Sequence, residues 1–529
     1  MATEVTSAAS EPRGTGEKGL KTNALGLVST TVIGVASTAP AYSLAATLGL
    51  VAAAVGLYSP GIMLLAFVPM LFIAAAYFYL NRADPDCGTT FTWVTRAMGP
   101  KTGWMAGWGI LMTDLIVMPN LAGIAAQYTF SLFGADGPAN NPHWQLLLGI
   151  VWIVAMTAIC YIGIELSAET QVGLLSYEIA VLVLFSCVAL FKAYFRHPAG
   201  RITPHIGWLN PFGSGSSSAL ATAILLAIFI YWGWDTAVTV NEEAKDKKRT
   251  PGRAAILSTI ILVAIYVLVT TAAQSLHGAD FLGKNPTDVL NAMGKDVLGS
   301  PWNKLLIIAV LTSAAASTQT TILPAARSAL SMAVHKAVPK KFADIHPRYL
   351  TPGFATLFLG GLSIAWYVFL TLVSNNVLKD SILALGFGIA FYYALTGYAC
   401  VVYYRKHLFS SAKNFFLIFL APLAGALFLT WAFIKSLFVY SNPSQSSSGA
   451  WWKFIDFDFK VGNFHYYAHG VGSVLVIGVG LLLLGLPLMA LWWVGHKEFF
   501  QHEREVAETV DGEAPPLTEG VDKELLRDA

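Results

Sequence analysis

The chain has 529 residues, of which 55% are hydrophobic and only 12% are Asp, Glu, Lys or Arg. Soluble chains carry roughly twice that share of charge, so the composition excludes an ordinary soluble protein and indicates a membrane protein. The net charge is +2, which gives no reason to expect a nucleic-acid partner. The four cysteines have no metal-ligand spacing, and we expect neither a metal nor a cofactor.

Residues 1–23 form a polar segment without a signal-peptide pattern, which we interpret as a cytoplasmic N-terminal tail. The apolar runs beyond it predict an all-α membrane protein with twelve transmembrane helices in the lipid bilayer. The predicted spans cover residues 24–57, 60–80, 104–133, 145–163, 171–194, 219–240, 254–275, 304–324, 353–373, 381–403, 414–437 and 471–494.

The first ten spans lie within residues 24–403 and the last two within 404–496, and we expect the aromatic segment at 438–470 between those two to be extracellular. Residues 497–529 form an acidic tail. With the N-terminus inside, 23 of the 33 Lys and Arg residues fall on the cytoplasmic side. This bias predicts a cell-membrane protein with both termini in the cytoplasm.

Two spans contain residues that interrupt a helix. The first carries small and hydroxyl residues up to Pro40, whose ring forbids a normal helical hydrogen bond. The sixth carries Gly233 between two tryptophans, followed at once by Asp235. A single kink in a membrane helix is more often structural. Two breaks at corresponding positions of two five-span blocks predict a transporter binding site.

Unwound backbone at mid-membrane depth can bind the two ends of an amino acid. The amides around Ser37 to Ala39 suit a carboxylate, and the carbonyls around Ile230 to Trp232 suit an ammonium group. The predicted substrate-binding residues are Ser37, Thr38, Ala39, Ile230, Tyr231, Trp232, Gly233 and Asp235.

Three carboxylates fall inside predicted spans: Asp114, Glu178 and Asp235. Each could cost about 3 kcal/mol at a helix centre, so we expect all three to face the bundle interior. They are candidates for proton coupling, with a structural hydrogen bond or the balancing of a cationic substrate as alternatives. Span eight adds a hydroxyl-rich stretch over 312–321, which indicates either close helix packing or a sodium or substrate site.

Three segments, in order along the chain, are similar to those of amino acid-polyamine-organocation permeases. They are Tyr79 to Trp93 with Gly99 to Trp108, then Gly233 to Asp235 with Asn241 to Glu243 and Arg249 to Ala254, then Ala325 to Leu330 with Val338 to Phe342 and Thr351-Pro352. The resemblance implies a leucine-transporter-type fold, with a 5+5 inverted repeat plus two C-terminal helices and alternating access. It also assigns the carboxylate to Ser37, Thr38 and Ala39, and it places Glu178 where some proton-coupled members have a lysine.

The leading hypothesis is a secondary transporter that imports amino acids or related amines with a co-transported proton; sodium is less expected. An exchanger, or a carrier selective for cations such as putrescine, is the main alternative. From a different class, a sensor on a transporter scaffold would need an output domain. We expect no enzyme, because the sequence lacks a His-Glu-x-x-His motif, a phosphate-binding glycine loop and a nucleophile elbow.

Overall fold

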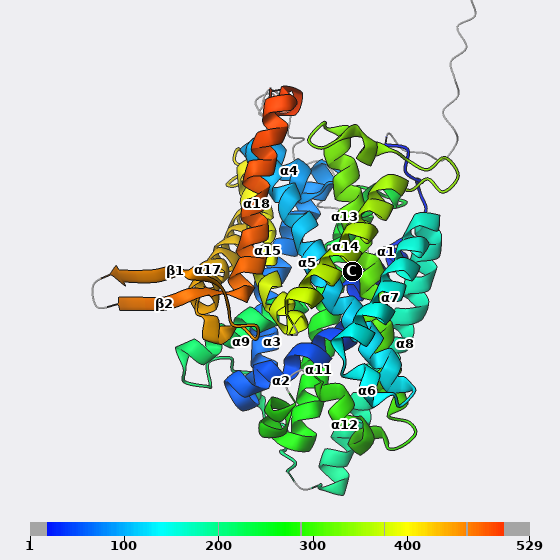
Figure 1. Cartoon of the computed structure of the whole chain (residues 1–529), viewed down its shortest axis with the longest axis vertical. Helices are drawn as coiled ribbons and strands as arrows, with labels where there is room; N and C mark the ends of the chain where they lie inside the picture. Colours follow the sequence, from blue (N-terminus) through cyan, green and yellow to red (C-terminus); the bar gives the residue numbers. More distant parts are fainter. Residues whose placement is uncertain (1–17, 199, 286–287, 375, 462–463, 502–529) are drawn as a thin grey trace, which may run out of the picture.

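Long helices that run side by side between two ends make up most of the molecule (Figure 1). The computed structural model describes residues 18–501 apart from 199, 286–287, 375 and 462–463. Most of the predicted N-terminal tail and of the acidic tail lies outside the described residues. The last described residues follow α18, which ends at the end of the molecule where α4 lies.

Within the part of the chain that the structure describes, ten helices are longer than 20 residues. They are α3 (Ser59–Ala83), α5 (Pro100–Leu132), α7 (Pro142–Ile162), α8 (Ile164–Phe191), α11 (Thr250–Lys284), α13 (Lys304–Val334), α14 (Gly353–Val373), α15 (Val377–Tyr403), α17 (Ala421–Ser441) and α18 (Ser473–Gly495). The shorter ones are α1 (Leu27–Ser37), α2 (Pro40–Val55), α4 (Thr90–Met98), α6 (Asp136–Ala139), α9 (Ser217–Ile230), α10 (Thr236–Thr239), α12 (Val289–Leu298) and α16 (Ala412–Asn414). Short 3₁₀ or π turns cover η1 (Gly56–Tyr58), η2 (Lys192–Arg196), η3 (Ile206–Leu209), η4 (Asn241–Glu243), η5 (Lys340–Ala343), η6 (Phe415–Leu420) and η7 (Pro443–Gln445).

Ten runs within the described residues are long and apolar enough to cross a membrane. The difference from the twelve predicted spans lies in two places. The run Leu27–Ala83 contains both the first and the second predicted spans, which meet at the turn of η1. The sixth predicted span is divided into α9 and α10, and each of these is too short to count alone.

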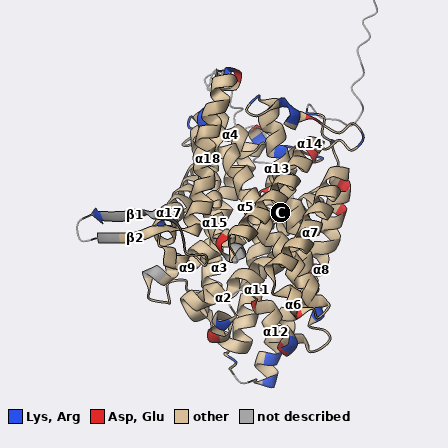
Figure 2. Cartoon of the chain, in the orientation of Figure 1, with Lys and Arg blue, Asp and Glu red and all other residues tan. Residues whose placement is uncertain are grey.

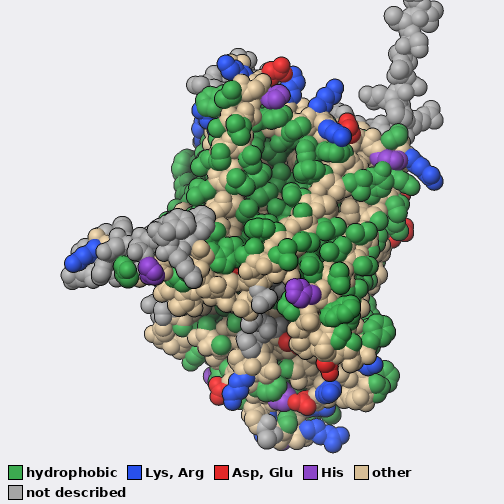
Figure 3. All heavy atoms as spheres, viewed as in Figure 1, with side chains coloured by type: hydrophobic (Ala, Val, Ile, Leu, Met, Phe, Trp, Pro, Cys, Tyr) green, Lys and Arg blue, Asp and Glu red, His purple; other side chains and the backbone are tan. Residues whose placement is uncertain are grey.

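The surface has the polarity pattern of a membrane protein. Hydrophobic side chains cover the middle of the visible face (Figure 3), and the charged residues gather toward its two ends (Figure 2). Large apolar side chains on the outer helices are exposed, among them Leu147 and Val151 on α7 and Leu372 on α14. Such a belt would be unfavourable in water and suits contact with lipid.

The aromatic segment before the last helix forms a β-hairpin, which corrects the expectation of an all-α chain. Strand β1 (Ala450–Val461) pairs antiparallel with β2 (Phe464–Gly472), with Val461 opposite Phe464 and Ala450 opposite Gly472. The hairpin projects sideways from the helical body beside α17 (Figure 1). A pair of hydrogen-bonded strands satisfies its inner backbone groups without a helix, so the segment can extend away from the bundle.

Helices α5 and α13 form the buried centre of the bundle, and α15 packs closely on α5. The approach depends on a small residue: a Cβ added to Gly388 on α15 would lie 2.1 Å from Thr113 Oγ1 on α5. Small residues allow two membrane helices to bring their backbones together. This packing sets the position of the residues of α15 that face the site described below.

A buried ion pair joins the segment after α10 to the end of α13. The guanidinium of Arg327 donates to both oxygens of Glu243, at 2.6 and 2.8 Å, and the two side chains are 2% and 0% exposed. Paired in this way, both charges keep hydrogen-bond partners although they are buried. The sequence contained both residues in separate motifs and did not indicate that they meet.

We predict that Glu243→Gln destabilises the fold strongly, because it leaves the Arg327 charge buried without its counter-charge. Breaking such a pair costs about 3–5 kcal/mol. The measurement is the midpoint of thermal unfolding of the purified protein in detergent. Glu165→Gln is the matched control, because Glu165 makes an exposed ion pair with Lys21. Equal midpoints for the two variants would contradict the prediction.

Candidate functional site

The first helix break lies between α1 and α2. Helix α1 ends at Ser37 and α2 begins at Pro40, and Ala39 between them has φ 48° and ψ 65°. Pro40 has no amide hydrogen to continue the hydrogen-bond pattern, and its ring clashes with the preceding turn. The break expected from this proline is therefore present in the structure.

The second break separates α9 from α10 by the non-helical residues 231–235. Gly233 has φ 114°, a conformation that side chains other than glycine rarely adopt. It also lies against the first break, because a Cβ added to it would be 2.7 Å from the carbonyl oxygen of Ser37. Glycine is required here both by the turn and by the close approach.

The two breaks contact each other and a third helix. Ser37 Oγ and Thr236 Oγ1 are 2.9 Å apart, and the hydroxyl of Ser317 on α13 donates to the Ser37 carbonyl at 2.9 Å. The structure thus places Ser37 next to Gly233, two predicted site residues that are about 200 positions apart in the chain, and Thr236, which was not predicted, joins them. It also shows that the hydroxyl-rich stretch of α13 contacts the breaks.

The free amides lie farther along the chain than Ser37 to Ala39, where the sequence analysis expected them. Those of Thr38 and Ala39 donate to carbonyls three residues earlier, both at 3.1 Å. Because these bonds close the end of α1, the amides of this break that lack a backbone partner belong to the first turn of α2. The carboxylate contacts expected at Ser37 to Ala39 stay a prediction. The amides that lack a backbone partner are those of Ala41 and Tyr42.

Glu178 on α8 lies at this first turn of α2 and is fully buried. Its Oε1 accepts the Ala41 amide at 2.7 Å and the Ser313 hydroxyl at 2.8 Å. The Tyr42 amide in turn donates to Ser313 Oγ at 3.3 Å. The second oxygen, Oε2, has no hydrogen-bond partner among the described residues. A carboxylate in this place is favoured by the positive end of the α2 dipole.

Asp235 is held at the second break by two tyrosines of α15. Tyr393 donates to Oδ1 at 2.8 Å and Tyr392 to Oδ2 at 3.1 Å, while the indole of Trp232 donates to the Tyr392 oxygen at 2.5 Å. Sequence reasoning missed both tyrosines. The adjacent pair of phenols inside an apolar span was the only local signal for them.

The other predicted residues of the second break make contacts of their own. The carbonyl of Ile230 accepts the Tyr266 hydroxyl at 2.5 Å, and the Tyr231 hydroxyl donates to the Met63 carbonyl at 2.9 Å. Of the carbonyls expected to bind an ammonium group, that of Ile230 therefore has a protein donor already. Those of Tyr231 and Trp232 lie in the non-helical stretch.

Asp114 on α5 has different surroundings from the other two acids. It is buried, and it lines a small cavity with residues of α13 and α14, including Thr321 and Ser363. Its Oδ2 and the Thr321 hydroxyl have no hydrogen-bond partner among the described residues. The hydrogen bonds that join the two breaks do not include Asp114, and its coupling role stays a prediction.

Comparison with known proteins identifies the family. Residues 23–455 match the amino acid permease family. The chain belongs to this family. The permease is 22% identical to the low-affinity putrescine importer of Escherichia coli over 406 residues, which cover 76% of this chain and 86% of the importer.

Two other relatives cover less of the permease. An uncharacterized transporter of Mycobacterium tuberculosis is 27% identical over 338 residues, 61% of this chain and 70% of that protein. A branched-chain amino acid permease of Lactococcus lactis is 26% identical over 239 residues, 41% of this chain and 49% of that protein. The helix breaks and the buried acids described above lie within the residues matched to the family.

At one end of the permease, residues 18–26 form a strap across the ends of several helices. The Ala24 and Leu25 amides both donate to the Glu243 carbonyl, at 2.8 and 3.0 Å, and the Lys245 amide donates to the Leu25 carbonyl at 2.9 Å. These bonds join the chain just before α1 to the segment just after α10. The strap therefore covers the end of the molecule at which α1 begins.

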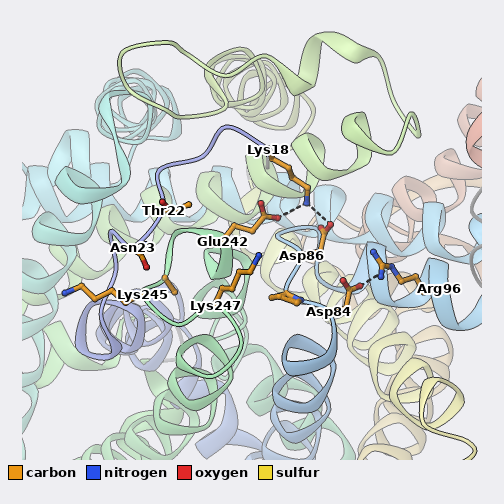
Figure 4. Close-up of a pocket in the computed structure, with 11 residues that line it drawn as sticks. Lys18, Thr22, Asn23, Asp84, Asp86, Arg96, Glu242, Lys245 and Lys247 are labelled. Carbon is orange, nitrogen blue, oxygen red and sulfur yellow. Dashed lines mark hydrogen bonds and ion pairs between the residues drawn. The ribbon is translucent and has the colours of Figure 1, made fainter. Parts of the chain in front are cut away.

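Lys18 ties the strap to two loops (Figure 4). Its ammonium lies 2.6 Å from Asp86 Oδ2, in the segment between α3 and α4, and 2.7 Å from Glu242 Oε1, after α10. The thiol of Cys87 is buried beneath it at 3.6 Å. Asp86, Cys87 and Glu242 bring three possible metal-ligand atoms within 4.8 Å of one another, but the Lys18 ammonium already supplies the positive charge.

A cavity of about 480 Å³ opens beside this cluster (Figure 4). Figure 4 shows Arg96 beside Asp84, and the distance from Arg96 Nε to Asp84 Oδ2 is 3.1 Å. The lining residues are Lys18, Thr22, Asn23, Asp84, Pro85, Asp86, Arg96, Glu242, Ala244, Lys245 and Lys247.

Charge governs the protonation of this cluster. Burial alone would lower the pKa of the Lys18 amine, but Cys87, Asp86 and Glu242 around it outweigh burial and raise that pKa. Burial likewise opposes the charge of Asp86, yet Lys18 holds the pKa of Asp86 below its usual range. Burial raises the pKa of Asp84 to about 6, against the opposite effect of Arg96. At neutral pH the tie between Lys18 and Asp86 is therefore a fully charged one.

We predict that Gly233→Ala disturbs the contact between the breaks. The new Cβ meets the Ser37 carbonyl and strains the turn, which should lower stability by about 1–3 kcal/mol. Thermal unfolding of the purified permease measures the loss. Gly173→Ala on α8 is the control, because no atom lies within 4 Å of a Cβ added there. An unchanged midpoint for Gly233→Ala would contradict the close approach.

We also predict that Lys18→Met speeds labelling of Cys87 by N-ethylmaleimide by about tenfold, since each charge-assisted bond lost is worth about 1.5 kcal/mol or more. Loss of the positive charge alone would disfavour the reactive thiolate and slow the reaction. An acceleration therefore reports that the strap opens. Peptide mass spectrometry separates Cys87 from the exposed Cys187, and Lys21→Met is the control. An equal or slower rate would refute the prediction.

Proposed function

We propose that the chain is a secondary transporter that moves amino acids or related amines across the cell membrane by alternating access. The observation that carries the proposal is the contact between two broken helices, each with a buried carboxylate beside it: Glu178 at the first break and Asp235 at the second. Unwound helices with buried acids are how transporters expose backbone groups to a ligand at mid-membrane depth. The names of the relatives, a putrescine importer and a branched-chain amino acid permease, support the substrate class.

We further propose that the bundle crosses the membrane twelve times, as two inverted blocks of five spans and two further helices. If α1 with α2, α3, and α9 with α10 each count as one span, the ten runs become twelve. The breaks then fall in spans one and six, the corresponding members of the two blocks. The excess of Lys and Arg among the predicted inner segments supports cytoplasmic termini.

The contacts along α1 and α2 suggest which end is closed. The strap and the ion pairs of Lys18 close the end before α1. Beyond the breaks, a cavity of about 500 Å³ opens among α2, α9, α15 and α17, lined largely by apolar side chains such as Ala46, Leu226 and Ile382. A cavity of about 480 Å³ also lies beside Lys18, so the strap end is distinguished by its backbone bonds and ion pairs and not by the absence of a hollow. A state that is tied shut at one end is what alternating access requires.

We propose protons as the coupling ion. Glu178 and Asp235 are both buried, and their hydrogen bonds are with a backbone amide and hydroxyls, partners that suit either a charged or a protonated acid. Uptake of radiolabelled amino acids and amines into proteoliposomes, with and without an imposed pH gradient, tests the proposal. Accumulation that follows the gradient supports it. Exchange without accumulation would indicate an exchanger, and uptake of none of the compounds would overturn the function.

We predict that Asp235→Asn lowers uptake at least about tenfold, because the amide has one acceptor oxygen for two tyrosine donors and carries no charge. Binding of the same compounds by thermal shift distinguishes the reason. Retained binding assigns Asp235 to coupling, and lost binding assigns it to the substrate. Asp136→Asn on the exposed α6 is the control. Full uptake by Asp235→Asn would remove this residue from the mechanism.

A further inference from the structure

Every backbone amide at the first helix break has a partner within the protein. The amides of Thr38 and Ala39 bond within α1, and Pro40 has none. The Ala41 amide donates to Glu178, and the Tyr42 amide donates to Ser313, which itself donates to Glu178. The next amide, that of Ser43, continues the helix by donating to the Ala39 carbonyl. The positive end of α2 is therefore already occupied by a carboxyl group of the protein.

A substrate carboxylate could use these amides only by displacing Glu178. Two carboxylates at one buried helix end repel each other, and the displaced Glu178 would lose the amide and the hydroxyl that it now accepts. No positively charged group contacts Glu178 among the described residues: its partners are the Ala41 amide and the Ser313 hydroxyl. The site thus disfavours a second anion.

The same site has unfilled capacity for a cation. Oε2 of Glu178 is fully buried and has no partner among the described residues. Asp235 adds a second buried carboxylate at the other break, where Tyr392 and Tyr393 donate to it. Ammonium groups bind buried carboxylates, and each of the two breaks has one.

We propose that Glu178 takes the place of a substrate carboxylate, so that the ligand is an organic amine without a carboxyl group. The inference rests on the proposed transport function and names its substrate class. Glu178 is then a specificity-determining residue: Oε1 accepts the Ala41 amide and the Ser313 hydroxyl, and Oε2 faces the amine. An amino acid would bring a second carboxylate to the helix end that Glu178 already occupies.

Matched pairs of compounds that differ only by the carboxyl group test the proposal. Ornithine with putrescine, lysine with cadaverine, and leucine with 3-methylbutylamine serve as pairs, with the full chain in proteoliposomes and in detergent. We expect at least one amine to be taken up, and to shift thermal unfolding, at a concentration at least tenfold lower than its amino acid. Equal or better binding of the amino acids would overturn the inference while leaving the transport function intact. Uptake of no compound from any pair would instead overturn the transport function.

Two variants separate specificity from general damage. Glu178→Ala frees the α2 amides, so the preference for amine over amino acid should fall at least tenfold. Glu178→Gln keeps an oxygen for those amides but removes the charge, so amine binding should weaken without a gain for the amino acid. Glu165→Gln, on the exposed part of the same helix, should change neither. An unchanged preference in Glu178→Ala would overturn the inference, and if that variant does not fold, the matched pairs and Glu178→Gln still decide it.

Discussion

The rest of the structure depends on one constraint: in an apolar bundle, every backbone amide and carbonyl released by a helix break must find a partner inside the protein. The first break meets the constraint with two short-range bonds and with Glu178 and Ser313. The second meets it with the hydroxyl of Tyr266 on the Ile230 carbonyl. The site is thus built from the groups that repair the breaks, and its chemistry follows from them.

This constraint explains the residue types around the breaks. Hydroxyl groups of α13 are small enough to enter the narrow space between helices, and Ser313 and Ser317 each supply a bond to the first break. Glycine at 233 lets the second break approach the Ser37 carbonyl. The tyrosines of α15 reach Asp235 because α15 packs closely on α5. The same residues therefore fill the space between the helices and bond the polar groups of the breaks. Replacing one of them by a larger or less polar residue would disturb both the packing and the hydrogen bonds.

Local patterns in the sequence were sufficient for the features that depend on neighbouring residues. The apolar runs predicted the long helices, and Pro40 and Gly233 predicted the two breaks. The three segments similar to those of the permeases predicted the family. The hairpin was missed, although acidic and aromatic residues alternate from Asp456 to Phe459 with the period of a strand. The sequence analysis had treated this stretch only as an aromatic extracellular segment.

Contacts between distant parts of the chain could not be predicted in the same way. Nothing near Asp235 indicates that Tyr392 and Tyr393 will hold it, and nothing near Lys18 indicates Asp86 or Glu242. The amides without a backbone partner, those of Ala41 and Tyr42, lie beyond Ser37 to Ala39, because the short bonds of Thr38 and Ala39 depend on the geometry at the end of α1. Such details arise from the packing of helices far apart in sequence.

The bonds of the strap have a mechanical consequence for the two broken helices. At one end, Leu25 pairs with Ala244 in a parallel backbone bridge; at the other, the Ser37 and Thr236 hydroxyls meet. Helix α1 and the segment from Thr236 to Ala244 are thus bonded to each other at both ends. Any rearrangement that opens the strap end must either move these two segments together as one rigid unit or first break one of the two contacts.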